Sequence, residues 1–166
     1  MRHDHLSDLP EWDDDDFKDE DDEGEEWKPN PTREACKALY YQWQQVMTVL
    51  NGALDSMTVE EKEDGFPADY WEDHKGMLLG DAYQVAVKIK SSEAGLYTIR
   101  MENASIIRKN AQFIKSSMLT MMAEEVIEKV HGQIIRDEID KFRELFKSWV
   151  STFQKDEYED EWGLFI

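Results

Sequence analysis

The sequence predicts an all-α protein, an antiparallel up-and-down four-helix bundle with a disordered acidic N-terminal tail. Apolar residues recur at steps of three and four along four long stretches, which is the spacing that collects side chains on one face of a helix. The sequence shows no alternating strand pattern and no internal repeat. Four amphipathic helices joined by short connections bury their apolar faces most simply against one another, as a bundle.

Most of the excess negative charge lies in the N-terminal tail. The chain of 166 residues has a formal net charge of -19, and its first 27 residues hold 14 Asp or Glu against 2 Lys or Arg. Because these charges repel one another, we expect residues 1–31 to be mostly disordered and residues 32–166 to form a single helical-bundle domain. The tail nevertheless contains apolar side chains that could dock on the bundle: Leu6, Leu9, Trp12, Phe17 and Trp27.

The first two helices are expected over residues 32–57 and 68–92. Thr32 follows two prolines and is a suitable N-cap, because its hydroxyl can accept a hydrogen bond from the first turn. Both stretches carry a stripe of apolar residues at helical spacing. The charged residues between them include Gly65 and Pro67, which predict a connection.

A third helical stretch covers residues 96–130 and is unusually long. It contains no Gly or Pro and would span about 50 Å at 1.5 Å per residue. The other helices would reach only about 36 Å, so we expect this one to break near residues 119–124. Gly132 is expected to end the stretch, with His131 favoured at a helix C-terminus, and the fourth helix is expected over residues 133–155.

Composition excludes several classes of function. No run approaches the roughly 18–20 apolar residues that cross a bilayer, and the first residues lack the apolar core of a secretory signal. An acidic chain is repelled by phosphate, so we expect no direct contact with nucleic acid or with an anionic membrane. The single cysteine, Cys36, cannot form an internal disulfide, and its place on an apolar stripe predicts a small core residue.

Carboxylates on or beside the apolar stripes are the residues that could carry chemistry. Asp81, Glu102 and Glu138 stand at helical spacing from apolar positions on three helices, and His74 lies two turns before Asp81. Inward carboxylates with a histidine could bind a divalent metal ion. The favoured alternative is a buried polar network in which nearby bases pair with these acids. Its expected members are Asp81, Glu102, Asn103, Asn110, Glu138, Lys88, Arg100 and Arg108.

The pattern of ferritin-like di-iron bundles is matched only once. Glu128 and His131 have the Glu-x-x-His spacing, but Glu138 is followed three residues later by Lys141 rather than by histidine. The sequence also lacks a Gly-rich phosphate loop, a nucleophile elbow and a Cys-x-x-Cys motif. We therefore expect no cofactor, with a divalent metal ion as the alternative.

The segments GMLLGDAYQVAVKIKSSEAGLYTIRMENASIIRKNA and RDEIDKFRELFKSWVSTFQKDEYEDEWGLF resemble an uncharacterised family of small acidic helical-bundle bacterial proteins. The resemblance extends over about residues 70–166. The family has no assigned activity, so the resemblance implies no functional residues. It implies only a setting in the bacterial cytoplasm.

The sequence predicts a function that depends on contacts more than on catalysis. We expect a non-enzymatic bundle that acts through a protein partner or through itself, for example as a homodimer. The reason is that a bundle of this size leaves part of its six Trp, six Tyr and seven Phe exposed. Two alternatives stay open, a carboxylate-rich metal-binding or metal-dependent enzyme bundle, and an acidic nucleic-acid mimic that binds a basic protein.

Overall fold

The computed structural model describes residues 9–17, 28–60 and 62–165. In this part of the chain the regular secondary structure is helical and includes no strand. A 3₁₀ helix, η1 (Asp14–Phe17), precedes four α-helices, which are α1 (Pro31–Asp55), α2 (Ala68–Ser91), α3 (Tyr97–Ala123) and α4 (Lys129–Ser151). The predicted all-α fold with four long helices is confirmed.

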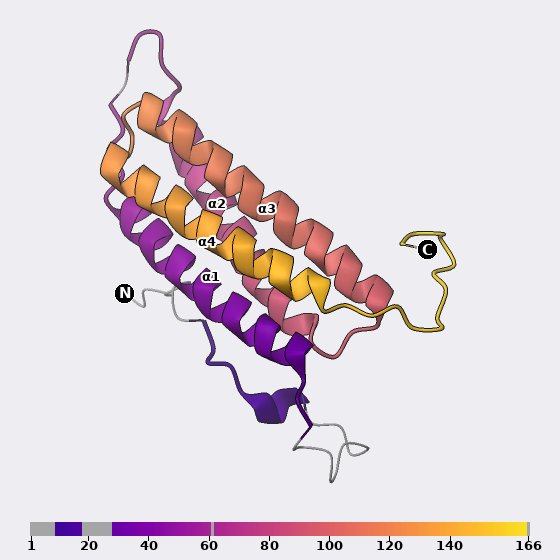
Figure 1. Cartoon of the computed structure of the whole chain (residues 1–166). Helices are drawn as coiled ribbons and strands as arrows, with labels where there is room; N and C mark the ends of the chain where they lie inside the picture. Colours follow the sequence, from indigo (N-terminus) through magenta and orange to yellow (C-terminus); the bar gives the residue numbers. More distant parts are fainter. Residues whose placement is uncertain (1–8, 18–27, 61, 166) are drawn as a thin grey trace.

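Each helix packs against two others, since α1 and α3 both contact α2 and α4. Figure 1 shows the α1–α2 and α3–α4 connections at one end of the molecule and the α2–α3 connection at the other. The first two connections are joined directly, because the backbone N–H of Thr58 donates to the carbonyl of Val126 over 3.0 Å. The four helices therefore form a bundle, as the apolar periodicity predicts.

Large side chains from different helices fill the interior of the bundle. Trp43 of α1, Ile107 of α3 and Trp149 of α4 are fully buried. Trp43 links three helices, because its indole N–H donates to the carbonyl of Ala82 in α2 over 2.8 Å and its ring lies 4.7 Å from that of Phe142 in α4. This interior fixes the relative positions of the helices and hence of the side chains on their outer faces.

The first helix starts at a different cap from the one predicted. The side chain of Asn30 accepts a hydrogen bond from the N–H of Arg33 over 3.0 Å, and Pro31 takes the first helical position, where a missing N–H costs nothing. Thr32 is buried, and its hydroxyl donates to the carbonyl of Thr152, just after α4. The prediction of Thr32 as N-cap is therefore wrong, and this residue connects α1 to the end of α4.

The predicted break in the third helical stretch is confirmed. α3 ends at Ala123, and Glu125 has a φ of 58°, a left-handed conformation that turns the chain out of the helix. The next helix begins at Lys129, four residues earlier than predicted. His131 therefore lies in the first turn of α4, and its predicted place at a helix C-terminus is wrong.

Gly132 lies inside α4, and the prediction that it ends a helix is also wrong. It is buried, and a Cβ at this position would lie 2.5 Å from both Cγ and Sδ of Met122. Because glycine has no side chain, the beginning of α4 can approach the end of α3 closely. Close packing, and not a chain break, explains this glycine.

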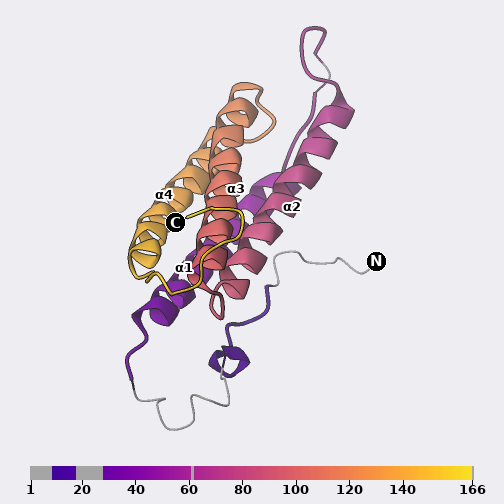
Figure 2. The same cartoon turned by 90° about the vertical axis from the view of Figure 1, so that its right-hand side faces the viewer.

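The described part of the acidic tail packs on the bundle, beside the start of α1 and the end of α2 (Figures 1 and 2). Trp12 is only 7% exposed, and its ring lies 5.7 Å from that of Tyr40 in α1. The hydroxyl of Tyr40 donates to the carbonyl of Pro10 over 2.5 Å. Burial of an indole ring is a substantial apolar contribution, which offsets the cost of ordering a short acidic segment.

Bases on the bundle also reduce the repulsion within this segment. Asp14 lies 3.5 Å from the ammonium of Lys37 in α1, and Asp16 lies 3.3 Å from that of Lys90 in α2. Exposed pairs of this kind contribute little by themselves, so the apolar contact carries the docking. Residues 9–17 are therefore docked, as their apolar side chains allow, and the disorder of the acidic tail as a whole stays a prediction. Outside the described residues lie Leu6 and Trp27.

Candidate functional site

The residues considered for a metal site lie in separate surroundings. His74 belongs to an aromatic cluster, in which its ring is stacked 5.7 Å from that of Tyr70 and lies 5.8 Å from that of Phe113. Burial lowers the pKa of this imidazole, because an apolar environment disfavours its charged form. Glu102 is exposed on α3.

Glu138 of α4 is held by two neighbouring side chains. Its Oε1 lies 2.7 Å from the ammonium of Lys141, and its Oε2 accepts a hydrogen bond from the amide of Gln42 over 2.7 Å. These bonds lower the pKa of Glu138. Asp81 is half-buried on α2. Across the described ranges, no group of three or more His, Cys, Asp or Glu side chains could hold a metal ion, so the four predicted residues are not brought together.

The predicted polar network is present only in part. Asn103 and Asn110 are buried, as expected. Their amides bind separate partners, since Asn103 donates to the hydroxyl of Ser92 over 3.0 Å and Asn110 donates to the side chain of Gln84 over 2.6 Å. Arg100 joins the first of these groups through a 2.9 Å hydrogen bond to the Ser92 carbonyl.

Three other predicted members do not lie in the interior. Glu102 and Arg108 are exposed on α3, and Lys88 is half-buried on α2. Successive side chains of an α-helix are rotated by about 100° around its axis. A position beside an apolar stripe can therefore face either a neighbouring helix or water. A single network that includes all eight predicted residues is therefore wrong, and Asn103 and Asn110 lie in two separate groups.

The sequence does not signal a buried ion pair between Arg33 and Glu93. Arg33 Nε lies 2.9 Å from Glu93 Oε1, and the side chain of Glu93 is only 1% exposed. The other carboxylate oxygen is buried and has no hydrogen-bond partner among the described residues. Burial raises the pKa of Glu93, although the guanidinium of Arg33 acts in the opposite direction. Glu93 stands in the segment SSEAG, whose Ser and Gly predict an exposed turn.

This ion pair joins four parts of the chain. Arg33 begins α1, Glu93 follows α2, and Arg100 of α3 donates to the carbonyl of Glu93 over 2.5 Å. Arg33 also donates to the carbonyl of Phe17 in the docked N-terminal segment over 3.1 Å. Because these contacts link α1, the end of α2, α3 and the N-terminal segment, we assign the pair a structural role.

Cys36 is close to this ion pair and has the properties of a core residue. Its thiol is buried and donates to the carbonyl of Ile89 over 3.4 Å. Burial, with a smaller effect from Glu93, raises the pKa of the thiol. A thiol that stays protonated is a poor nucleophile.

Glu93→Gln is expected to change how stability depends on pH. The native state holds the proton of Glu93 more tightly than the unfolded state does, because the pKa of this carboxyl is raised above 4.5 on folding. Its contribution to stability is therefore full below pH 4.5 and is lost as the pH rises through the raised pKa. We expect the free energy of unfolding of the wild type, relative to that of Glu93→Gln, to fall over this range in urea titrations.

The matched control is Glu102→Gln, which removes an exposed carboxylate from α3. Its difference from the wild type, measured at the same pH values, is the baseline with which the Glu93→Gln difference is compared. A constant difference between the wild type and Glu93→Gln would contradict the assignment of a raised pKa to this residue.

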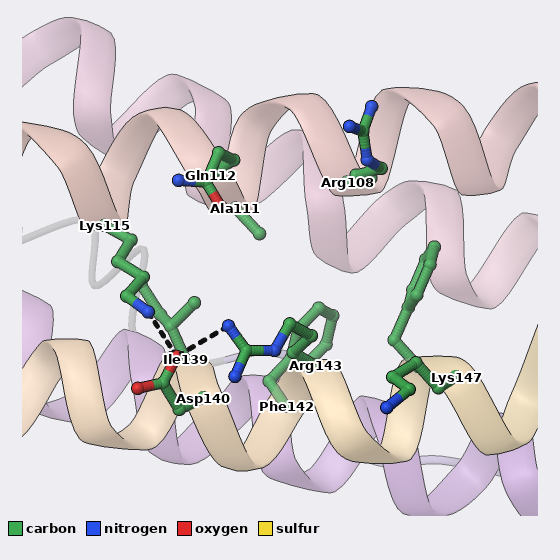
Figure 3. Close-up of a pocket in the computed structure, with 10 residues that line it drawn as sticks. Arg108, Ala111, Gln112, Lys115, Ile139, Asp140, Phe142, Arg143 and Lys147 are labelled. Carbon is green, nitrogen blue, oxygen red and sulfur yellow. Dashed lines mark hydrogen bonds and ion pairs between the residues drawn. The ribbon is translucent and has the colours of Figure 1, made fainter.

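A groove between α3 and α4 forms a cavity on the described part of the bundle (Figure 3). Its volume is about 260 Å³. Its apolar floor consists of Ala111, Ile139, Phe142 and Phe146. Its basic rim consists of Arg108, Lys115, Arg143 and Lys147. The lining is completed by Gln112 and Asp140.

The basic rim is only partly neutralised. Asp140 forms an ion pair with Lys115, and its Oδ1 lies 3.2 Å from the guanidinium of Arg143, as the dashed lines in Figure 3 show. The hydrogen bond from Lys115 lowers the pKa of Asp140, so this carboxylate stays ionised at neutral pH. Arg108 is exposed and has no hydrogen bond or ion pair with any residue of the described ranges. Glu144, beside the groove, lies 3.3 Å from the ammonium of Lys147 and 3.9 Å from the guanidinium of Arg143. Two acids therefore serve four cations, and Arg108 is the rim cation with no acid partner in the described ranges.

The charge of the two helices differs in sign from that of the whole chain. α3 and α4 together hold nine Lys or Arg and five Asp or Glu, while the chain has a net charge of -19. On α3 the rim residues are seven positions apart, and on α4 they are four apart, which places each pair on one helix face. This spacing is the signal in the sequence that could have indicated a basic face on each of the two helices.

Comparison with models of known protein families, with curated proteins and with solved structures found no match. None of the helices in the described residues combines the length and apolarity needed to cross a bilayer. The groove is therefore the feature of the structure on which a proposed function rests.

Proposed function

We propose that the protein is a non-enzymatic helical bundle that acts through protein–protein interaction, and that its α3–α4 groove binds an acidic partner segment carrying apolar side chains. The observation that carries this proposal is the basic rim around an apolar floor, in a chain whose net charge is -19. The apolar floor offers burial to a large side chain, and the rim offers charge-assisted hydrogen bonds to carboxylates.

The size of the groove favours side chains of a peptide over a free small molecule. Pockets for drug-sized ligands measure about 300–1,000 Å³, and this groove, at about 260 Å³, lies below that range. A peptide needs room for only one or two anchoring side chains, while the rest of it lies on the surface.

The charge distribution favours a short acidic segment over a long polyanion. The tail and the connections carry most of the acid, so a nucleic acid that crossed the bundle would meet repulsion on either side of the groove. A peptide that contacts only the rim would avoid this repulsion. The same distribution gives less support to mimicry of nucleic acid, because the rigid α3–α4 surface is net positive.

The finer expectations from the sequence are part of the proposal. An antiparallel up-and-down topology is supported by connections at alternating ends of the bundle. The proposal also includes a bacterial cytoplasmic setting. It includes a homodimer as one form that the protein–protein interaction takes. A metal-binding or enzymatic bundle has less support, because the predicted ligands lie apart.

The proposal is tested by titrating a fluorescein-labelled peptide of alternating Glu and Trp with the full chain and following fluorescence anisotropy. Arg108→Glu is expected to weaken binding about 10-fold, which corresponds to about 1.4 kcal/mol. Lys109→Glu is the matched control, since it makes the same charge reversal at the next residue of α3, outside the groove. It is expected to weaken binding less than about twofold.

Two results would overturn this proposal. Equal weakening by both variants would show that only overall charge matters. Absence of binding of this peptide, with binding of a Lys–Trp peptide of equal length, would instead favour the acidic-mimic alternative.

A further inference from the structure

The chain itself contains a segment with the chemistry that the groove selects. Residues 157–165, with the sequence EYEDEWGLF, combine four acids with large apolar side chains. The exposed fractions of these apolar side chains are 66% for Tyr158, 87% for Trp162 and 56% for Leu164. Figure 1 shows the C-terminus clear of the four helices, and no residue of the segment lines the groove. An indole this exposed is the kind of side chain that gains most from an apolar site.

The segment starts next to the two helices that form the groove. Asp156 follows α4, and its Oδ2 accepts a hydrogen bond from the backbone N–H of Tyr97 at the start of α3 over 2.9 Å. A carboxylate at a helix N-terminus is also favoured by the helix dipole. Asp156 therefore anchors the segment at the end of the α3–α4 pair.

The length of the segment matches the distance to the groove. From Tyr97 to Arg108, the first rim residue on α3, the helix advances about 16 Å at 1.5 Å per residue. From Asp156 to Trp162 an extended chain covers about 20 Å. Trp162 can therefore reach the apolar floor while Asp156 stays bound to Tyr97, and the acids between them then pass the basic rim.

We propose that residues 157–165 are an internal occupant of the α3–α4 groove, with Trp162 as its anchor on the apolar floor, and that they compete there with the partner. This inference rests on the proposed function, since it concerns the same groove. A tethered occupant acts at a high effective concentration, so a partner must displace it before it binds. The segment also indicates the ligand chemistry, an acidic stretch followed by Trp and Leu.

The competition is measured with the same labelled Glu–Trp peptide and the full-length double variant Trp162→Ser/Leu164→Ser. If the segment occupies the groove about nine-tenths of the time, the variant is expected to bind the peptide about 10-fold more tightly than the wild type does. Val130→Ser is the matched control, because it removes an apolar side chain that is 65% exposed at the other end of α4. It is expected to leave the affinity unchanged.

The outcomes separate this inference from the proposed function. Equal binding of the peptide to the wild type and to the double variant would overturn the internal occupant and leave the groove as the binding site. No binding to either protein would overturn the proposed function itself.

Contact between Trp162 and the groove is tested by ¹⁹F NMR of the chain labelled with 5-fluorotryptophan. The Trp162 resonance is assigned by its loss in Trp162→Phe. Arg108→Glu is expected to shift this resonance, and Lys109→Glu is not. The shift is expected to be independent of protein concentration. A resonance that moves on dilution would overturn the intramolecular assignment and show that the segment binds a second copy of the chain.

Discussion

Replacing Trp43 with alanine is expected to lower the free energy of unfolding by about 3–5 kcal/mol, a large part of the stability of an ordinary domain. The side chain is fully buried, lies against Phe142 and donates to the carbonyl of Ala82. Alanine would leave a cavity at the junction of α1, α2 and α4, and it would remove the hydrogen bond. Urea denaturation followed by far-ultraviolet circular dichroism measures the loss.

Two variants show which part of Trp43 matters. Trp43→Phe keeps an aromatic ring but removes the N–H donor, and is expected to cost less than the alanine variant. Tyr41→Ala is the matched control, because Tyr41 is an aromatic residue of the same helix that is 43% exposed. It is expected to cost below about 1 kcal/mol. A cost at position 43 no greater than that at 41 would contradict the position of Trp43 at the centre of the interior.

Trp12→Ala is expected to release the docked N-terminal segment from the bundle. Trp12 supplies the buried ring of that segment and contacts both Tyr40 and Phe17. Without it, the segment keeps only the partly buried side chains of Leu9 and Phe17, exposed ion pairs and isolated hydrogen bonds, each of which contributes less than a buried indole. Cleavage after Phe17 by chymotrypsin is expected to become at least about 10-fold faster, because proteolysis follows the population of the undocked form.

Glu11→Ala is the control for this experiment, because the Glu11 side chain is exposed in the same segment. The hydrogen bond of Glu11 to Lys90 uses its backbone carbonyl and survives the substitution. Cleavage of this variant is expected at the wild-type rate. If Trp12→Ala were cleaved no faster than Glu11→Ala, the indole would not hold the segment in place.

The helices could be predicted from sequence because one physical requirement fixes them. A helix in a bundle has to bury a stripe of apolar residues, and this stripe is visible as spacing. The break at Ala123 could be predicted for a related reason, since a helix much longer than its neighbours cannot bury its whole stripe. Both inferences use information that is local or nearly local in the chain.

The start of α4 could not be predicted in the same way, and docking of the tail could be named from its apolar side chains only as an option. Glycine is a residue type that often ends a helix, so the sequence around Gly132 indicates a chain break. Only the position of Met122 shows that Gly132 instead allows close packing. Trp12 stands in a run of acids, and its burial depends on a surface formed by α1 and α2. In both cases the deciding contact is with a residue distant in sequence or in another helix.

The groove could not be predicted from charged residues at interior spacing, because its cations lie on the outer faces of α3 and α4. The two amides that were expected to be buried, Asn103 and Asn110, are buried. The acids assigned to the same interior are not, since Glu102 is exposed and Asp81 is half-buried. The basic rim lies on the outside, where spacing places residues on one face of a helix but does not show that the faces of two helices form a groove.

The glycine at position 132 has a mechanical consequence for this groove. It stands seven residues, or about 10 Å of helix, before Ile139, the first lining residue of α4. A methyl group at 132 would meet Cγ and Sδ of Met122, so either that side chain adopts another rotamer or the beginning of α4 moves away from α3. Gly132 thus lets α4 lie close to α3 near one end of the groove, although it contributes no side chain to either wall.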